Sequence, residues 1–258
     1  MTLRAEVDIL PRKALRASKP LVSIITVVFR AREELPALIE SVARLKTDRV
    51  EFIVIDGGSK HGTCELLSQY DSVIDYWTSE ADRGIYDAMN KGIAAAQGIF
   101  LFHLNAGDRL LHIPVQELEA AASRGSDIVT FRVSIDDKQE FRPARGLVLR
   151  FKNTLHHQGT FYKRESFPVY DVSYLVFADF DANQRLARRG AHIEIFDQVV
   201  ALHQGGGLSD VKTKANISEF FRVIQKNYGW THLPPAWLIC KWRGLKTRLS
   251  KILKRVSN

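Results

Sequence analysis

A charged loop and a polar turn enclose one helix in the stretch Asp82–Asp108, DRGIYDAMNKGIAAAQGIFLFHLNAGD. The turn ends in the carboxylate of Asp108, directly after the apolar run Ile99–Leu104, which predicts a strand. Open α/β sheets bind their ligands beyond the carboxyl ends of such strands. The loop supplies Arg83 beside a helix N-terminus near Gly84, and both features suit a phosphate group. This stretch therefore predicts a ligand-binding edge of a sheet.

The helix between these groups is indicated by apolar residues at i, i+3, i+4, i+7, i+8 and i+11, namely Ile85, Ala88, Met89, Gly92, Ile93 and Ala96. Gly98 is expected to stop it. The preceding chain alternates strands and helices, with strands at Leu21–Phe29, Val50–Ile55 and near Ile74–Thr78, and helices at Leu35–Leu45 and Thr63–Tyr70. Such alternation predicts a parallel sheet with right-handed crossovers, so residues 21–110 form a nucleotide-binding type of α/β half.

The second half is more varied. It predicts helices at Pro114–Ser123, Phe177–Arg189 and Lys214–Tyr228, and strands at Asp127–Ile135, after His156 and at Ile193–Phe196. Asp136-Asp137 indicates a hairpin, Gly190 a helix stop, and His203–Ser209 a glycine-rich loop. We divide the chain into a basic lead-in (1–20), one large domain (21–215, with halves 21–110 and 111–215) and a basic, tryptophan-containing helical extension (216–258).

Composition limits the classes of protein that fit. A chain of 258 residues can bury a substantial core, and its net charge of +8 suggests an anionic partner. It has no run of ~18 apolar residues and no apolar signal-peptide core near its N-terminus. Cys64 and Cys240 are far apart and lack metal-site spacing, which favours a reducing compartment. We therefore expect a cytoplasmic protein.

Several spaced motifs occur in a characteristic order: SIITVVF, EFIVIDGGSKHGT, SEADRGIYDAMNKGI, LNAGD, HQGTFYKRE, ADFDANQRLARRGAHI and HQGGGLS. Over about residues 21–210 the chain resembles the family 2 inverting glycosyltransferases, especially the bacterial polysaccharide-assembly branch. The resemblance implies a GT-A fold, with a mostly parallel, Rossmann-like central sheet flanked by helices. It also implies a nucleotide-diphosphate sugar donor, with UDP favoured, and a divalent metal.

Transfer from a diphosphate carrier requires that the departing pyrophosphate be neutralised, and a hard cation such as Mn2+ or Mg2+ does this. Asp108 is the expected metal ligand, with His203 matching a late ligand of relatives. The family usually has Asp-x-Asp in this turn, where this chain has Asn105 and Gly107. Asp108 as a simple turn residue is the alternative.

The remaining donor contacts also follow from the resemblance. Asp56 is placed like an aspartate that contacts the nucleobase, although an Asx-turn before Gly57-Gly58 would also explain it. Arg83 is expected at phosphate, with Asp82 orienting it. Thr26 and Asn105 complete the expected donor set, and a threonine in a strand is also simply a good strand former.

An inverting displacement needs a base for the attacking hydroxyl. Asp179 matches the aspartate of a family Glu-Asp pair whose glutamate is Ala178 here, and Asp181 is the alternative base. His157 and Gln158 match a segment that borders the acceptor, although a lone histidine is commonly structural. The acceptor is expected to be a glycan intermediate, in this branch a lipid-linked one.

The C-terminal residues combine tryptophans with lysines and arginines: Trp230, Trp237, Trp242, Lys241, Arg243, Lys246, Arg248, Lys251, Lys254 and Arg255. This mixture predicts peripheral binding to an anionic membrane surface on the cytoplasmic side of the inner membrane. Nucleic-acid binding by the same mixture and a solvated helix packed on the domain are the alternatives.

Three other functions compete. A sugar-phosphate nucleotidyltransferase would need a glycine-rich phosphate loop after the first strand, and Phe29-Arg30-Ala31-Arg32 has no glycine. A basic nucleic-acid-binding protein would spread its charge over a reading motif, so no nucleic acid is expected. A degenerate transferase that binds donor without turnover would explain Asn105, Gly107 and Ala178.

Overall fold

The computed structural model describes residues 19–60, 62–205, 213–239 and 241. The strands are β1 (Val22–Val28), β2 (Val50–Asp56), β3 (Tyr76–Ser79), β4 (Phe100–His103), β5 (Arg109–Leu110), β6 (Ile128–Ile135), β7 (Gln139–Phe141), β8 (Thr160–Lys163) and β9 (Ile193–His203). The helices are α1 (Leu35–Leu45), α2 (Thr63–Gln69), α3 (Ile85–Ala95), α4 (Val115–Ser123), α5 (Ala178–Arg188) and α6 (Lys214–Tyr228). Short 3-10 turns cover Leu147–Arg150, His157–Gly159 and Trp230–His232.

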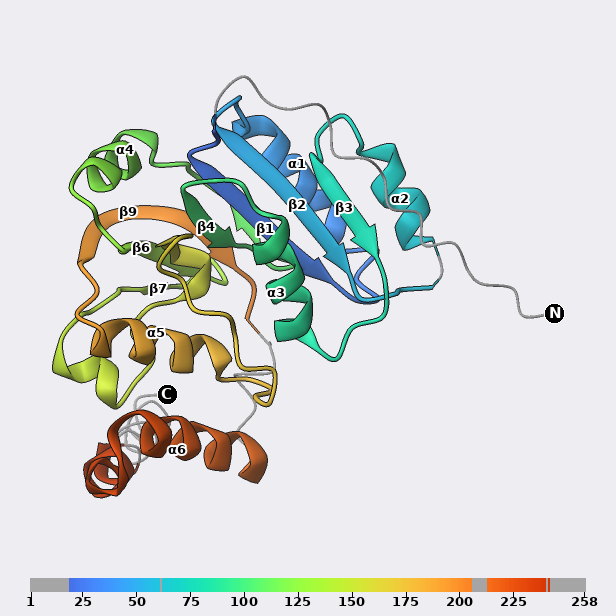
Figure 1. The fold of residues 1–258 in the computed structure, drawn as a ribbon. Coiled ribbons are helices and arrows are strands. Elements are labelled where there is room, and N and C mark those ends of the chain that lie inside the picture. The colour runs from blue at the N-terminus through green and yellow to red at the C-terminus, as the bar shows by residue number, and fades with distance from the viewer. Residues whose placement is uncertain (1–18, 61, 206–212, 240, 242–258) are drawn as a thin grey trace, which may run out of the picture.

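The described strands form a single sheet in the order β3-β2-β1-β4-β8-β6-β9-β5, with β7 paired to β6 (Figure 1). The pairs β2–β3, β1–β2 and β1–β4 are parallel, which confirms the parallel sheet expected in the first half. Every residue of β1 and β2 is buried. This burial on both faces explains why the sequence of these strands is almost uninterrupted apolar.

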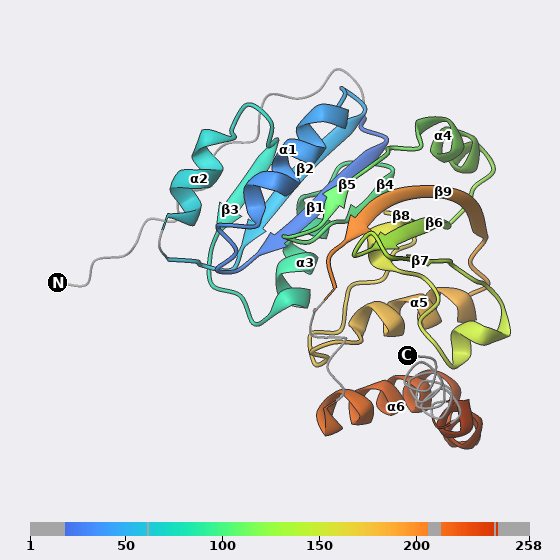
Figure 2. The ribbon, with the colours of Figure 1, turned by 180° about the vertical axis from the view of Figure 1, so that it is seen from behind.

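Two apolar layers cover the faces of the sheet. One contains Ile24 and Phe52 together with the buried sides of α1, α2 and α4. The other contains Ile25 and Ile53 together with those of α3, α5 and α6. Successive strand residues point to opposite faces, so neighbours in sequence enter different layers. Figures 1 and 2 show α1 and α3 on opposite sides of the sheet.

Strand direction reverses at β8, which is antiparallel to both β4 and β6. β9 is parallel to β6 and antiparallel to β5, so the second half of the sheet is mixed rather than mostly parallel. The connection from β6 to β8, residues 136–159, contains β7 and short 3-10 turns but no α-helix. A parallel pair of strands needs a crossover connection, usually through a helix, so this connection suits the antiparallel pairing of β6 and β8. As a result the carboxyl end of β4 lies beside the amino end of β8.

A ladder of four phenylalanine rings crosses this reversal, one ring each from β4, β8, β6 and β9. The centroids of Phe102 and Phe161 are 4.3 Å apart and stacked. Phe161 meets Phe131 edge-on at 5.5 Å, and Phe131 stacks on Phe196 at 5.3 Å. Both arrangements are favourable for aromatic pairs. This phenylalanine ladder therefore joins the two halves of the sheet.

The hairpin predicted at Asp136-Asp137 is confirmed. It joins β6 to β7, and both residues have positive φ, at 51° and 54°. Aspartate tolerates this left-handed region better than most residues do. The predicted strand at Ile193–Phe196 was too short, because β9 continues to His203. Exposed Asp197 and Gln198 interrupt its apolar pattern, and the pairing with β6 shifts there.

Gly98 does not stop α3 as predicted. The helix ends at Ala95, Ala96 is already extended with φ −68° and ψ 141°, and Gly98 has no positive φ. A Cβ on Gly98 would lie 2.6 Å from the backbone nitrogen of Ser23. Glycine is needed here because the chain passes very close to β1. By contrast, Gly190 has φ 78° directly after α5, which confirms it as a helix stop.

The start of α3 also differs from the predicted stripe. Tyr86 is buried there, whereas Ile85 is 38% exposed. The later members of the stripe, Ala88, Met89 and Gly92, are buried as expected. Ile85 is therefore available to a ligand, and Tyr86 anchors the helix.

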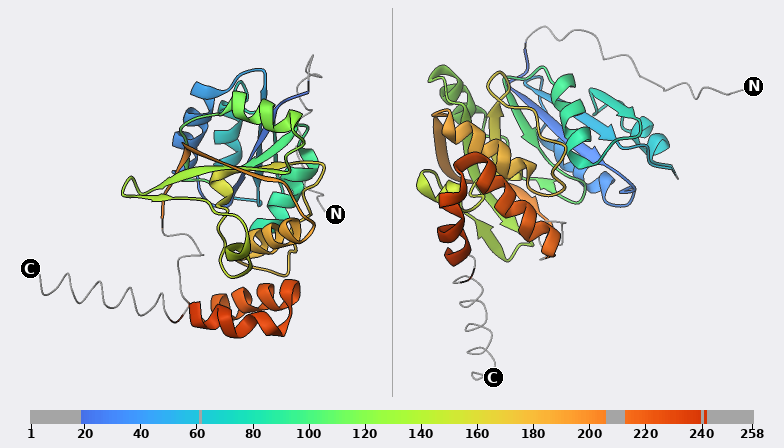
Figure 3. Two further views of the ribbon diagram at one scale, coloured as in Figure 1. Left: turned by 90° about the vertical axis from the view of Figure 1, so that its left-hand side faces the viewer. Right: turned by 60° about the horizontal axis from the view of Figure 1, so that its bottom comes forward.

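α6 forms an outer layer against α5, on the side away from the sheet (Figure 3). Residues 233–239 are also helical, and Trp230 and Trp237 are 72% and 51% exposed. The basic cluster predicted to bind membranes lies mostly in residues 242–258, outside the described residues. Among the helices that the structure describes, none has the length and apolar character needed to cross a bilayer.

Candidate active site

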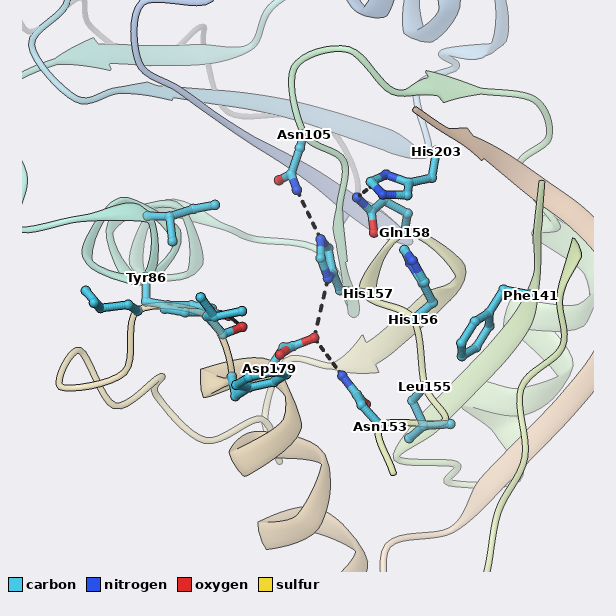
Figure 4. A pocket seen from close by; sticks show the side chains of 14 residues that line it. Tyr86, Asn105, Phe141, Asn153, Leu155, His156, His157, Gln158, Asp179 and His203 are labelled. Carbon is cyan, nitrogen blue, oxygen red and sulfur yellow. Dashed lines mark hydrogen bonds and ion pairs between the residues drawn. The ribbon is translucent and has the colours of Figure 1, made fainter. Parts of the chain in front are cut away.

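A pocket of about 310 Å3 opens where the end of β4 meets the start of β8 (Figure 4). Its polar wall consists of Asn105, Asn153, His156, His157, Gln158, Asp179 and His203. Its largely apolar wall consists of Ile85, Tyr86, Phe141, Leu155, Leu175, Val176 and Phe177. Five residues predicted from motifs far apart in the sequence thus share one pocket, because the strand reversal brings their segments together.

A relay of polar contacts crosses the pocket from β4 to α5. The side-chain amide of Asn105 lies 3.1 Å from Nε2 of His157. Nδ1 of His157 lies 3.5 Å from Oδ2 of Asp179, which also accepts a 2.8 Å hydrogen bond from Asn153. The dashed lines in Figure 4 follow this relay. The imidazole and the amide thereby fix the orientation of the carboxylate.

The two candidate bases have different surroundings. The side chain of Asp179 is 13% exposed and faces the pocket. Asp181 is fully buried, away from the pocket lining. It lies 2.9 Å from Arg185 as an ion pair without hydrogen-bond geometry, and it accepts a 3.0 Å hydrogen bond from Asn227 of α6. This arrangement makes Asp181 a packing residue between two helices and leaves Asp179 as the carboxylate that a substrate can reach.

Asp108 lies behind the pocket and is 2% exposed. Its Oδ2 accepts hydrogen bonds from the backbone N–H of Asn105 at 3.0 Å and from Nε2 of Gln158 at 2.8 Å. Its Oδ1 lies 2.8 Å from Nδ1 of His203. We assign the proton to Nδ1, because an ionised carboxylate only accepts hydrogen bonds. To share a cation with Asp108, His203 would have to present the lone pair of Nδ1, with its proton moved to Nε2.

These residues suit a divalent cation as partial ligands. A carboxylate and an imidazole are adjacent, and the amide oxygens of Asn105 and Gln158 are buried without a hydrogen-bond partner among the described residues. Within the same part of the chain, no group of three or more histidine, cysteine or acidic side chains could hold a metal ion. A cation here would therefore take the rest of its shell from phosphate and water oxygens.

Of the expected donor residues, Asn105 lines the pocket, whereas Asp56 at the end of β2 and Asp82 and Arg83 between β3 and α3 lie outside its lining. Asp56 is fully buried, and its Oδ2 accepts hydrogen bonds from Ser59 N–H at 2.8 Å and the Ser79 hydroxyl at 2.5 Å. Its Oδ1 has no hydrogen-bond partner among the described residues. A Cβ on Gly57 would lie 2.3 Å from Oδ2 of Asp82, so glycine at this position lets the Asp82 carboxylate approach the backbone after β2.

Two further donor predictions, Thr26 and Arg83, differ in how exposed their side chains are. Thr26 lies two residues before the end of β1 rather than at its end, and it is fully buried. Its hydroxyl has no hydrogen-bond partner among the described residues, and its contact with the donor stays a prediction. Arg83 is 76% exposed at the start of α3 and pairs with Asp87 at 3.0 Å. This pairing raises the pKa of Arg83 and lowers that of Asp87, and the guanidinium stays accessible to an anion.

Sequence reasoning missed three residues that shape the site. Asn153 holds Asp179, Tyr86 donates a 2.5 Å hydrogen bond to the carbonyl of Val176, and His156 lies in the pocket wall. The double histidine in HHQG was the available signal for His156. Burial, and then the nearby His157 and His203, hold the pKa of His156 well below its ordinary value.

A second buried histidine lies on β4 just before the pocket. Burial, and then the nearby His157, lower the pKa of His103 to about 3. Neither ring nitrogen of His103 has a hydrogen-bond partner among the described residues. His103 therefore stays neutral, and it packs against Tyr170 with ring centroids 5.6 Å apart.

Comparisons with known proteins agree with this architecture. The family model described as glycosyl transferase family 2 matches residues 23–196. A Mycobacterium tuberculosis protein named PGL/p-HBAD biosynthesis glycosyltransferase is 31% identical over 207 residues, covering 74% of this chain and 80% of that protein. An uncharacterized glycosyltransferase of the same species is 33% identical over 175 residues, covering 63% of this chain and 67% of that protein.

Solved structures share the fold at low sequence identity. S. aureus TarS aligns with TM-score 0.62 and 14% identity over 79% of this chain, but over only 38% of the TarS chain. A mannosyltransferase from Pyrobaculum calidifontis, in complex with GDP-Man and Mn2+, aligns with TM-score 0.56 and 16% identity, over 78% of this chain and 60% of that one. The strand order, the reversal at β8 and these neighbours define a GT-A glycosyltransferase fold.

The chain belongs to glycosyl transferase family 2. Membership sets aside the nucleotidyltransferase and nucleic-acid-binding alternatives. It leaves the donor, the acceptor and the roles of individual residues to be argued from the site.

Proposed function

We propose that this protein transfers a sugar, with inversion, from a nucleotide-diphosphate donor to a hydroxyl of a glycan acceptor whose proton passes to Asp179. The observation that carries the proposal is the position of this carboxylate. It faces the pocket, held by Asn153 and His157, and the relay continues to Asn105 at the end of β4. A carboxylate so oriented suits a general base.

The chemistry of the step is a single displacement. The acceptor hydroxyl gives its proton to Asp179 while its oxygen bonds to the anomeric carbon. The bond from that carbon to the diphosphate oxygen breaks, and the nucleoside diphosphate leaves from the opposite side. Asn153 and His157 keep Asp179 in place during this change.

The donor is proposed to bind across the ends of β2 and β3. Asp56 offers its buried Oδ1 to an N–H of the base, and Arg83 offers its guanidinium to phosphate. We favour a uridine nucleotide because TarS has been solved with UDP and with UDP-GlcNAc.

We propose that Mn2+ or Mg2+ is held by Asp108 and His203. When bound, such a cation neutralises charge on the departing diphosphate. Asp108 has two further contacts, from Asn105 and Gln158, and these orient the carboxylate in the absence of any cation.

The acceptor is proposed to be a glycan intermediate, lipid-linked in the cell. The M. tuberculosis relative is named for PGL/p-HBAD biosynthesis. The pocket also has one apolar wall, formed in part by Ile85, Leu175 and Phe177. Bacterial surface polysaccharide assembly and peripheral attachment to the cytoplasmic face of the membrane follow as parts of this proposal.

Thermal shift with UDP, UDP-glucose, UDP-GlcNAc and GDP-mannose, each with and without Mn2+, tests donor and metal together. A ligand at ~100 times its dissociation constant stabilises by about 2.7 kcal/mol, which corresponds to roughly 5–11 °C for a chain of this size. Asp108→Ala is expected to remove the Mn2+-dependent part of the shift. The stabilising donor is then assayed for transfer to octyl glycosides. Binding without turnover would indicate a degenerate transferase, and full turnover in excess EDTA would exclude the metal.

A further inference from the structure

Glu219 of α6 binds three successive backbone amides of the loop that precedes α5. The N–H of Leu175 donates to its Oε2 at 2.9 Å, and the N–H groups of Val176 and Phe177 donate to its Oε1, both at 2.7 Å. The residue is 9% exposed, so water competes little for these bonds. Hydrogen bonds from backbone amides to a carboxylate are about twice as strong as neutral ones.

The three residues held in this way form part of the pocket wall. Leu175, Val176 and Phe177 all line the pocket, and α5 with Asp179 begins directly after them. The peptide of Val176 is held from both sides, because Tyr86 of α3 donates a 2.5 Å hydrogen bond to its carbonyl. Segment 175–177 is therefore hydrogen-bonded both to Tyr86 of α3 and to Glu219 of α6.

Other α6 side chains hold the chain just before this segment. Arg222 donates a 3.0 Å hydrogen bond to the carbonyl of Ser173, and Lys226 pairs with Asp171 at 2.9 Å. These side chains are exposed, so each contact stabilises only modestly. Among these contacts, the buried carboxylate of Glu219 is the one that decides the path of segment 175–177.

We infer that Glu219 is a positioning residue for acceptor binding: it fixes segment 175–177 so that the apolar wall of the pocket faces the acceptor next to Asp179. This inference rests on the proposed function, in which this pocket receives the acceptor. α6 lies beyond residues 23–196, the part matched by the family model. The outer helix would then be a working part of the acceptor site.

The test compares Glu219→Gln with Asn227→Ala. Glutamine keeps the size of the side chain but turns an NH2 group toward one of the three N–H donors. Asn227 is also buried on α6, yet it bonds to Asp181 and Gln184 of α5 and leaves the loop alone. Each variant removes buried hydrogen bonds made by α6, but only Glu219→Gln removes bonds to segment 175–177.

Two readouts are taken, the first without any ligand. Hydrogen exchange of a peptide covering residues 170–180 is expected to be faster in Glu219→Gln than in wild type and Asn227→Ala. With UDP-glucose, or whichever sugar nucleotide the thermal-shift panel selects, and the best octyl glycoside acceptor, the acceptor KM is expected to rise about tenfold in Glu219→Gln. That is the effect of losing one charge-assisted hydrogen bond. The donor KM should change less than twofold.

Equal hydrogen exchange in Glu219→Gln and wild type would overturn the inference, and so would an unchanged acceptor KM or an equal rise in Asn227→Ala. If Glu219→Gln fails to fold, Tyr86→Phe removes the bond on the other side of the Val176 peptide, and an unchanged acceptor KM in that variant would also overturn it. A wild-type protein that binds no donor would refute the proposed function instead, so the two failures can be told apart.

Discussion

Replacing Asp179 or Asp181 by asparagine separates catalysis from packing. In Asp179→Asn the charge is lost, but the new amide oxygen can still accept the hydrogen bond that Asn153 now gives to Oδ2. The residue is also partly exposed, with a side-chain exposure of 13%. We therefore expect the melting temperature to fall by less than about 4 °C, the effect of a change of under ~1 kcal/mol. Transfer should fall by ~10² or more, the scale of general-base catalysis.

Asp181→Asn should do the opposite. Asp181 is fully buried and compensates Arg185 at 2.9 Å and Lys226 at 3.4 Å. Removing one partner of a buried ion pair costs about 3–5 kcal/mol. Because Arg185 and Lys226 are 23% and 44% exposed and can turn to water, we take roughly 2–3 kcal/mol. For a chain of this size that lowers the melting temperature by roughly 4–12 °C.

The assay is initial-rate transfer at a temperature at least 15 °C below the melting temperature of the weaker variant, with calorimetry on the same samples. Donor affinity should change little in Asp179→Asn, since the nucleotide is proposed to bind at Asp56 and Arg83. A larger loss of transfer in Asp181→Asn than in Asp179→Asn, measured on folded protein, would refute the assignment of the base.

Three further outcomes are expected. The folded-state pKa of His103 is about 3, far below the unfolded value of about 6.5, so the wild-type protein loses stability below pH 6.5 as the unfolded chain gains a proton there. His103→Phe should reduce this loss between pH 6.5 and 5 by up to ~2 kcal/mol, measured by urea titration at each pH. An equal pH dependence of stability in the variant and the wild type would contradict this prediction. Gly98→Ala should destabilise by about 1–3 kcal/mol, because its Cβ would meet Ser23 backbone at 2.6 Å, and an unchanged urea midpoint would show that β1 gives way freely. Deletion of the residues after Tyr228 should abolish co-sedimentation with anionic vesicles at low salt, while transfer to an octyl glycoside continues. High salt should likewise reduce the co-sedimentation of the full chain. Equal sedimentation of the truncated and full-length proteins would exclude the membrane role.

Much of the first half could be predicted from sequence because each parallel strand there is buried on both faces and each helix has a clear apolar stripe. Asp179 and His157 could be placed in one site because their motifs are local and ordered. The antiparallel pairing of β8 with β4 and β6 could not be predicted, since no periodicity in the sequence encodes the direction of a neighbouring strand. The position of His203 at the end of β9 could not be predicted, because the polar residues Asp197 and Gln198 interrupt the apolar pattern and make the strand look shorter than it is.

Other features had no local signal at all. Glu219 looks like any charged residue on an amphipathic helix, and only the tertiary packing of α6 directs it to the backbone of Val176. Gly98 was assigned to the right vicinity for the wrong reason, because a close approach to Ser23 arises between segments 75 residues apart. Such long-range contacts become visible only when the strands are placed in order.

The phenylalanine ladder gives the register of β8 a direct bearing on chemistry. Phe102 faces Phe161 across the β4–β8 pair, and His157 and Gln158 precede that strand by only a few residues. A slip of β8 by one residue would displace these side chains by about 3.3 Å and send alternate residues of the strand to the opposite face. It would separate His157 from Asn105 and break the stack of rings at the same time. Ring stacking in the interior of the sheet thus fixes the register of β8 and, through it, the position of His157 between Asn105 and Asp179.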